Sequence, residues 1–230
     1  EILVHHIRNQ LSDMERVKSQ IADLSGVRRG HVSIACSQAL LPYFLPQQIA
    51  LYRKEHPAVT FGVYLRDRAA AEQALVDHTA DLALVFEPLL TVRQQVYGVM
   101  SANHPLTKFE TLRLRDCLQH PIALPTSPYG VRYLMEMALV DSPIVLDPVI
   151  ESDSFEFLRN HTLSEGVISF QIPIGLPMED IPNGSVVRPL DTRDVPTGLI
   201  YIGQLRGRTL PVAVARFADQ ITKALQVQYD

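Results

Sequence analysis

The chain has 230 residues, of which 47% are hydrophobic, and a mean hydropathy of +0.06; these values predict a globular protein with enough apolar side chains for a sizeable core. Lys and Arg number 21 against 25 for Asp plus Glu, a formal charge of -4 that disfavours a phosphate-binding surface, so strong DNA binding by the chain itself is not expected. No apolar run approaches the roughly 18 residues that span a bilayer, and the first residues lack the basic-then-apolar order of a secretory signal. With only two cysteines, Cys36 and Cys117, no disulfide framework is predicted, and a cytoplasmic location is expected.

A heptad pattern marks the first segment. Apolar residues recur in steps of three and four, as on a coiled-coil seam with Lys18 in the one missing place: Val4, Ile7, Leu11, Met14 and Ile21. Ser25 and Gly26 then supply a stop signal. The pattern predicts a free-standing helix over residues 1–26, which packs either on its own globular domain or, as a dimerisation helix, against a partner chain.

From residue 31 the pattern changes to short β-rich runs that alternate with helical stretches. The first cycle predicts strands over 31–36, 59–65 and 81–86, with helices over 44–56 and 69–78 between them. Such a βαβαβ order is typical of a parallel sheet.

A second cycle begins near Pro121. It predicts strands over 122–124, 145–151, 167–170 and about 185–190, and helices over 131–139 and 155–163. A last strand over 199–204 and a closing amphipathic helix are expected to return to the first unit. The predicted domains are therefore 31–118 plus 199–230 for the first unit and 119–198 for the second.

Six short motifs occur along the chain in a fixed order. They are Arg29–Ala35 followed by Leu45-Pro46, Arg53–Pro57, Asp81–Val85, His104-Pro105-Leu106, Glu165–Ser169 and Leu210–Phe217. Each is short, but together and in this order they resemble the effector-binding region of LysR-type transcription regulators. The resemblance covers essentially all of the chain.

This resemblance implies two Rossmann-like α/β subdomains of the periplasmic-binding-protein type, joined by two crossover strands, with a small-molecule effector in the cleft. In that family a winged helix-turn-helix domain precedes a long linker helix that pairs in a dimer, and the predicted helix over 1–26 fits that linker. DNA would be bound only through the helix-turn-helix domain, which is missing from this sequence. The resemblance thus implies a homodimer or homotetramer that needs no cofactor.

Candidate effector-binding residues follow the predicted strands, because parallel sheets bind ligands at the carboxyl ends of their strands and helix N-termini favour anions. Ser37 and Gln38 follow the first strand of the first unit, and Thr126, Ser127 and Tyr129 follow the first strand of the second. The alternative for Ser37 or Ser127 is an ordinary N-cap that satisfies its own helix.

Further candidates come from positions that match the family pattern. These positions are Phe86, Ser101, Ser154, Phe170 and Gln171. Gln171 stands where the family usually has proline, so this wall of the pocket is expected to be more polar.

Arg132, one turn into its predicted helix, could neutralise the carboxylate of an anionic effector, or it is a solvated surface arginine.

Two other kinds of site receive little support. Cys36 lies beside a predicted helix N-terminus, which lowers thiol pKa values and suits an oxidant sensor, but a buried structural cysteine is the alternative. The eight histidines show neither an HxxxH nor an HExxH spacing, so no metal site is expected.

Three functions compete. The heptad helix favours a ligand-gated regulator over a solute-binding protein for uptake, since a transport receptor does not need an N-terminal dimerisation helix. An enzyme is not expected, because the sequence contains no GxSxG, GxxxxGK[ST], GxGxxG or HExxH motif.

Overall fold

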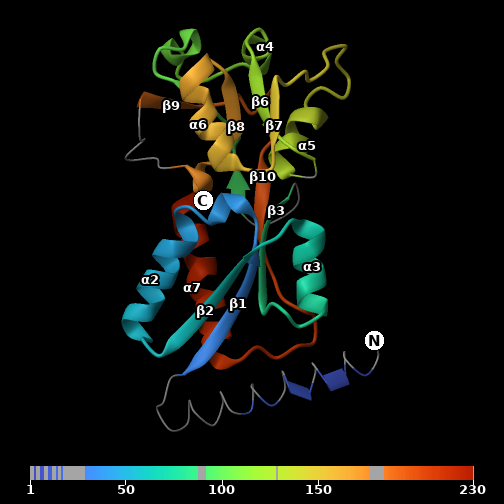
Figure 1. Ribbon diagram of the computed structural model, residues 1–230, viewed down its shortest axis with the longest axis vertical. Helices are drawn as coiled ribbons and strands as arrows, with labels where there is room; N and C mark the ends of the chain where they lie inside the picture. The colour runs from blue at the N-terminus through green and yellow to red at the C-terminus, as the bar shows by residue number, and fades with distance from the viewer. Residues whose placement is uncertain are drawn as a thin grey trace. The chain divides into compact units, whose positions relative to one another are not determined.

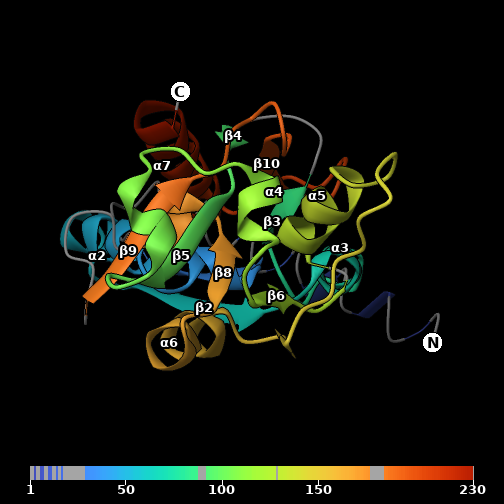
Figure 2. The same cartoon turned by 90° about the horizontal axis from the view of Figure 1, so that it is seen from above.

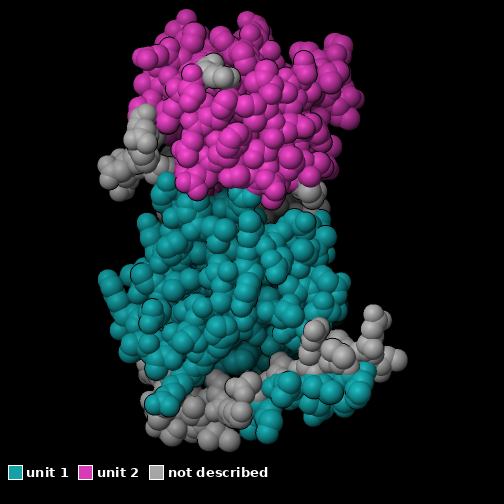
Figure 3. Space-filling view, in the orientation of Figure 1, with its two compact units in different colours: residues 1–85, 201–230 teal, residues 86–200 magenta. Residues whose placement is uncertain are grey.

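The computed structural model describes residues 29–87, 92–127, 129–176 and 184–229, together with positions 3, 6, 7, 10, 11, 14 and 17 of the first segment. The chain forms two compact units (Figure 3). Unit 1 contains Glu1–Val85 and Tyr201–Asp230, and unit 2 contains Phe86–Ile200. The boundary after residue 85 lies well before residue 118, where the sequence placed it, because the intervening strand Tyr97–Ser101 pairs within the sheet of unit 2.

The first sheet carries, in the described part of the chain, five strands in the order β2-β1-β3-β10-β4. Their bounds are β1 Gly30–Cys36, β2 Val59–Leu65, β3 Leu82–Glu87, β4 Val92–Gln94 and β10 Gly198–Gly203. β1 runs parallel to both β2 and β3, whereas β10 is antiparallel to β4. The strands of the first βαβαβ cycle are thus parallel, as their order along the chain predicts.

Helices cover both faces of this sheet (Figure 1). They are η1 Gln38–Leu40, α2 Phe44–Glu55, α3 Arg68–Val76 and α7 Val212–Tyr229. On the face of α2 and α7, the ring of Tyr52 contacts those of Phe61 and Phe217 at centroid distances of 5.8 and 5.3 Å, and its hydroxyl donates to the carbonyl of Ala213 at 2.9 Å. The closing helix is therefore an integral part of the first unit's core.

A largely buried ion pair connects the returning chain to the first sheet. Asp81, at the start of β3, accepts a hydrogen bond from the backbone N–H of Ser33 at 2.9 Å and pairs with Arg208 at 2.8 Å. The two side chains are only 13% and 12% exposed. Asp81 therefore joins β1, β3 and the segment that leads into α7.

The second sheet lies wholly within unit 2 and has the order β7-β6-β8-β5-β9 in the described residues. Its strands are β5 Tyr97–Ser101, β6 Ile122–Pro125, β7 Ile150–Ser152, β8 Ile168–Gln171 and β9 Ser185–Pro189. β6 is parallel to β7 and β8, but β5 is antiparallel to β8 and β9.

Helices also flank the second sheet. They are η2 Pro105–Lys108, α4 Leu114–Cys117, α5 Gly130–Met137, α6 Phe155–Glu165 and η3 Pro173–Gly175. α6 lies on one side of the sheet and α4 and α5 on the other (Figure 2). None of the helices in the described part of the chain combines the length and apolar character that crossing a membrane requires.

The predicted strands differ from the structure at three places, since neither β4 nor β5 was predicted and β7 is shorter than expected. The strand predicted over 145–151 begins only at Ile150, because Pro143 and Pro148 interrupt the preceding segment, in which Val145 is exposed. Strand β5 was not predicted at all. Its Gly98 has no side chain, and a Cβ there would lie only 2.7 Å from Leu112.

The described positions of the first segment are helical, and their apolar side chains are 46–69% exposed: Leu3, Ile7, Leu11, Met14 and Val17. At 100° per residue these five positions fall within an arc of about 120°, which is one face of a helix. Val4 and Ile21, also predicted on the seam, lie outside the described residues.

Replacing Asp81 by Ala should lower the free energy of unfolding by about 3 kcal/mol, because it leaves the Arg208 guanidinium buried without its carboxylate. Urea unfolding followed by circular dichroism measures the change. The matched control is Glu72→Ala, which removes the exposed Glu72–Arg68 pair of α3 and should cost less than about 1 kcal/mol. Equal effects in the two variants would show that burial of the Asp81–Arg208 pair does not stabilise the fold.

Candidate functional site

The carboxyl ends of β6, β7 and β8 meet at one edge of the second sheet because these strands are parallel. Thr126 follows β6, Ser152 ends β7 and Gln171 ends β8. The backbone N–H of Thr126 donates to the carbonyl of Ser152 at 3.1 Å, so the carboxyl ends of β6 and β7 are in direct contact. We call this edge the carboxyl-end edge of unit 2.

The turn between β6 and α5 carries three of the predicted residues. Tyr129 precedes the helix, donates its backbone N–H to the carbonyl of Thr126 at 3.2 Å, and packs its ring edge-on against Phe155 at 5.3 Å. Because α5 begins at Gly130, Ser127 does not occupy its N-cap position. Ser127 is exposed, so its hydroxyl is accessible from solvent.

Ser154 acts as the N-cap of α6. Its hydroxyl accepts from the backbone N–H of Phe157 at 3.2 Å, and its own N–H donates to the hydroxyl oxygen of Ser152 at 3.0 Å. The sequence predicted Ser154 as a ligand contact. The structure gives its oxygen a helix-capping role, which leaves the hydroxyl hydrogen to donate elsewhere.

Phe170 and Gln171 lie in the interior of unit 2. Phe170 is fully buried in β8, opposite Gly98 of β5. The side-chain amide of Gln171, also buried, donates to the backbone carbonyl of Phe155 at 2.8 Å and so supports the first turn of α6. A proline at position 171 could not make this contact.

Ser101 is separated from the other candidates by the direction of β5. It pairs with Ser185 of β9, whereas Tyr97, at the opposite end of β5, pairs with Gln171. Four residues of strand place Ser101 about 13 Å along the sheet from the carboxyl-end edge. The structure therefore brings Tyr97 to this edge instead, and no short motif in the sequence marked it.

In unit 1, Ser37 follows β1 and its backbone N–H donates to the carbonyl of Leu84 at 2.9 Å. It occupies the N-cap position of η1, yet its side chain makes no capping hydrogen bond, and its hydroxyl oxygen is buried without a hydrogen-bond partner in the protein. The capping alternative for Ser37 is therefore not what the structure shows. Gln38 is the first residue of η1.

Buried polar atoms in folded proteins nearly always have a partner, and leaving one unsatisfied costs about 1–3 kcal/mol. The Ser37 hydroxyl is thus a group that an added hydrogen-bonding molecule could satisfy. Phe86 belongs to β3, but its side chain lies outside the described residues.

Arg132 is neither a free cation nor a solvated surface arginine. Its Nε donates to Glu136 at 2.5 Å, its Nη1 contacts Glu151, and the side chain is only 15% exposed. Burial alone would lower the pKa of Arg132, but the hydrogen bonds and charges of the two carboxylates raise it overall.

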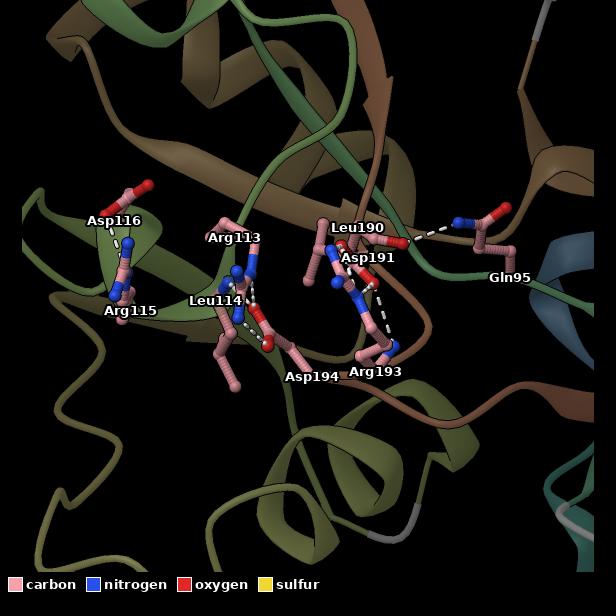
Figure 4. A network of polar contacts seen from close by, with 9 residues as sticks. All are labelled: Gln95, Arg113, Leu114, Arg115, Asp116, Leu190, Asp191, Arg193 and Asp194. Carbon is pink, nitrogen blue, oxygen red and sulfur yellow. Dashed lines mark hydrogen bonds and ion pairs between the residues drawn. The ribbon is translucent and has the colours of Figure 1, made fainter.

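A second polar network lies beside the chain segment that follows β9 (Figure 4). Arg113 donates two hydrogen bonds of 2.7 Å to Asp194, which also accepts from the backbone N–H of Leu114 at 2.9 Å. The bonds from Arg113 hold the pKa of Asp194 below its usual range. Residues 113 and 194 are far apart in sequence, so no local motif could predict this pair.

Both thiols are buried, so Cys36 is the buried cysteine that the sequence offered as the alternative to an oxidant sensor. Burial raises the pKa of Cys36, and also that of Cys117, to about 12. The helix that follows Cys36 is the three-residue η1, too short to offset this loss of solvation. Among the described residues, no group of three or more His, Cys, Asp or Glu side chains could hold a metal ion.

Two α/β units with central sheets, between which the chain passes twice, give the two-subdomain fold of the periplasmic-binding-protein type. The family model of the LysR substrate binding domain matches residues 25–226, and the chain belongs to that family.

Individual relatives agree with this assignment. The HTH-type transcriptional regulator CbbR of Sinorhizobium medicae is 28% identical over 161 residues, which are 66% of this chain and 50% of that protein. The chain thus spans about half the length of this curated relative.

Among solved structures, HinK, a LysR family transcriptional regulator from Pseudomonas aeruginosa, gives a TM-score of 0.70 at 19% identity, covering 94% of this chain and 78% of that one. The effector binding domain of QuiR in complex with shikimate gives a TM-score of 0.70 at 16% identity, covering 88% and 100%. These likenesses establish the fold.

The native thiols should react with a disulfide reagent such as dithionitrobenzoate far more slowly at pH 8 than the thiols of the urea-unfolded chain, because only the thiolate attacks and burial suppresses it. Absorbance at the released thionitrobenzoate band measures the two reaction rates. Folding also raises both thiol pKa values, so the contribution of the thiols to the free energy of unfolding should be lost as the pH rises from about 9 toward 12. Equal rates for native and unfolded protein would contradict the buried environment.

Proposed function

We propose that this chain is the effector-sensing and oligomerisation region of a LysR-type bacterial transcription regulator. A small molecule binds it and modulates DNA binding by a winged helix-turn-helix domain that lies outside this sequence. The observation that carries the proposal is the family match over residues 25–226 in a chain with the two-unit fold. As a DNA-bound regulator the protein works in the cytoplasm and catalyses no reaction.

The proposed effector contacts come from the loops that follow the parallel strands of each unit. In unit 1 they are Ser37 and Gln38, supported by the buried hydroxyl of Ser37. In unit 2 they are Thr126, Ser127 and Tyr129, supported by their place in the turn before α5 at the carboxyl-end edge. Hydroxyl and amide groups in this arrangement can recognise a small polar molecule by hydrogen bonds.

Signal transmission then needs only that the ligand binds one conformation of the regulator more tightly than another. A hundredfold difference in affinity between the two conformations shifts their equilibrium by about 2.7 kcal/mol, which is enough to change how much of the DNA site the regulator occupies. The effect on DNA is therefore indirect.

A solute-binding protein for uptake is the alternative function with the same fold. The matched relative CbbR is a transcriptional regulator rather than a transport receptor. The first segment also presents exposed apolar side chains on one helical face, which suits a dimerisation helix. Both observations favour the regulator.

Replacing Ser37 or Thr126 by Ala should reduce the thermal stabilisation that an effector produces, since each change removes a proposed contact. A library of small metabolites that includes shikimate, the ligand of the QuiR domain, supplies the probes for a thermal-shift screen of the unmodified chain. A loss of at least tenfold in affinity is expected for each variant toward any compound that stabilises the chain.

The control is Ser164→Ala, an exposed serine near the end of α6 whose loss should leave the ligand response unchanged. If Ser37→Ala and Thr126→Ala respond as Ser164→Ala does, these two residues are not effector contacts. If no small molecule stabilises the chain, the proposed function itself fails.

Placing charges on the helical face of the first segment should weaken self-association. The double substitution Leu11→Glu and Met14→Glu puts two carboxylates where a partner helix would pack, and the weight-average mass in sedimentation equilibrium should fall. The control Gln10→Glu adds charge at a position that is already polar. An unchanged association state in the double variant would show that this helix does not form the dimer.

A further inference from the structure

The next inference rests on the proposed function and concerns the kind of chemical group that unit 2 recognises. Arg132 lies in the first turn of α5, three residues beyond the proposed contact Tyr129. Its partner Glu151 lies in β7, next to Ser152, whose carbonyl receives the N–H of Thr126. Arg132 and Glu151 therefore belong to the helix and the strand that adjoin the proposed ligand contacts, and an anionic effector bound there would be expected to use this cation.

In the structure, the positive charge of Arg132 already faces two carboxylates. Arg132 donates from Nε to Glu136, one helical turn further along α5, and from Nη1 to Glu151 on the neighbouring strand. Arg132 is largely buried, whereas the two carboxylates are about half exposed. One positive and two negative charges leave this cluster with one negative charge in excess.

An approaching carboxylate or phosphate would meet both glutamates as well as the arginine. Opposite charges of equal size and similar distance cancel, so the sum over this cluster repels an anion. A neutral hydroxyl or amide group carries no such penalty. The hydroxyls of Thr126 and Ser127 and the backbone N–H groups of the first turn of α5 can still donate hydrogen bonds to a neutral oxygen.

We propose that Glu136 and Glu151 are specificity-determining residues, which neutralise Arg132 so that the site of unit 2 recognises an uncharged polar group of the effector in preference to a carboxylate or phosphate. This replaces the expectation of an anionic effector that Arg132 suggested in the sequence. It also predicts that removing the two negative charges creates an anion site.

The test uses the double variant Glu136→Gln, Glu151→Gln, in which glutamine can still accept the hydrogen bonds of Arg132 but carries no charge. The probe is inorganic sulfate at about 10 mM, with sodium chloride at matched ionic strength as reference, a concentration too low for general salting-in or salting-out effects. Sulfate should raise the melting temperature of the double variant by about 2–4 °C relative to chloride. It should leave that of the unmodified chain unchanged.

Two further variants assign the effect to this cluster. Adding Arg132→Gln to the double variant should abolish the sulfate response, and each variant is compared with its own chloride value, so that a loss of basal stability cancels. The matched control is Glu72→Gln, which removes the negative charge beside Arg68 in the first turn of α3, outside the proposed site, and should give no response to sulfate. Should the triple variant fail to fold, the single variants Glu136→Gln and Glu151→Gln should each give a smaller response than the double variant.

Sulfate stabilisation of the unmodified chain that Arg132→Gln removes would overturn the proposal, because Arg132 would then already be available to anions. So would the absence of any gain in the folded double variant. The test needs no natural effector, so its failure is independent of the metabolite screen that tests the proposed function.

Discussion

The buried pair of Asp81 and Arg208 is the interaction on which the first unit depends. It joins β1 and β3 to a segment more than a hundred residues further along the chain, and it does so with both charges largely withdrawn from water. Such a pair is costly to break from one side, because the remaining charge stays buried. Together with the ring cluster around Tyr52, it makes α7 a necessary part of the first unit.

In the second unit the decisive constraint is the direction of β5. Three parallel strands bring their carboxyl ends to one edge, and the antiparallel β5 presents its amino end there. Tyr97 consequently lies at the edge that holds Thr126 and Ser152, whereas Ser101 is carried to the far end of the sheet. The strand directions therefore determine which side chains can lie in the same site.

Much of the architecture could be predicted from the sequence, because local patterns carry it. The alternation of apolar residues marked β2, and the motif at Glu165–Ser169 contains Gly166, which ends α6 at a φ of 64° that few other residues adopt easily. The fold class and the family follow from such patterns in order. The end of the first unit could not be predicted in this way. The short strand β5 has no helix before it, so it does not follow the βαβ pattern by which the predicted strands were found.

The candidate site was less predictable, because its properties come from contacts across long stretches of chain. The pairing of Arg132 with Glu151 joins a helix to a strand residue 19 positions further along the chain, and together with Glu136 it surrounds the arginine with two carboxylates. For Cys36 the sequence left a reactive thiol and a buried cysteine as alternatives, and burial in the sheet raises the pKa of the thiol. The contact of Gln171 in β8 with Phe155 at the start of α6 could not be predicted either, because it depends on how the strand and the helix pack together.

The discontinuity of the first unit has a consequence for the order in which the protein is made. The five described strands of the second sheet lie between residues 97 and 189, so that unit can complete its sheet on the ribosome before Arg208 and α7 are synthesised. The first unit must wait for Arg208 and α7, which are synthesised after every described strand of the second sheet. During that interval the half-built sheet exposes the apolar face that Phe217 will cover, and this is the stage at which a nascent chain would most need a chaperone.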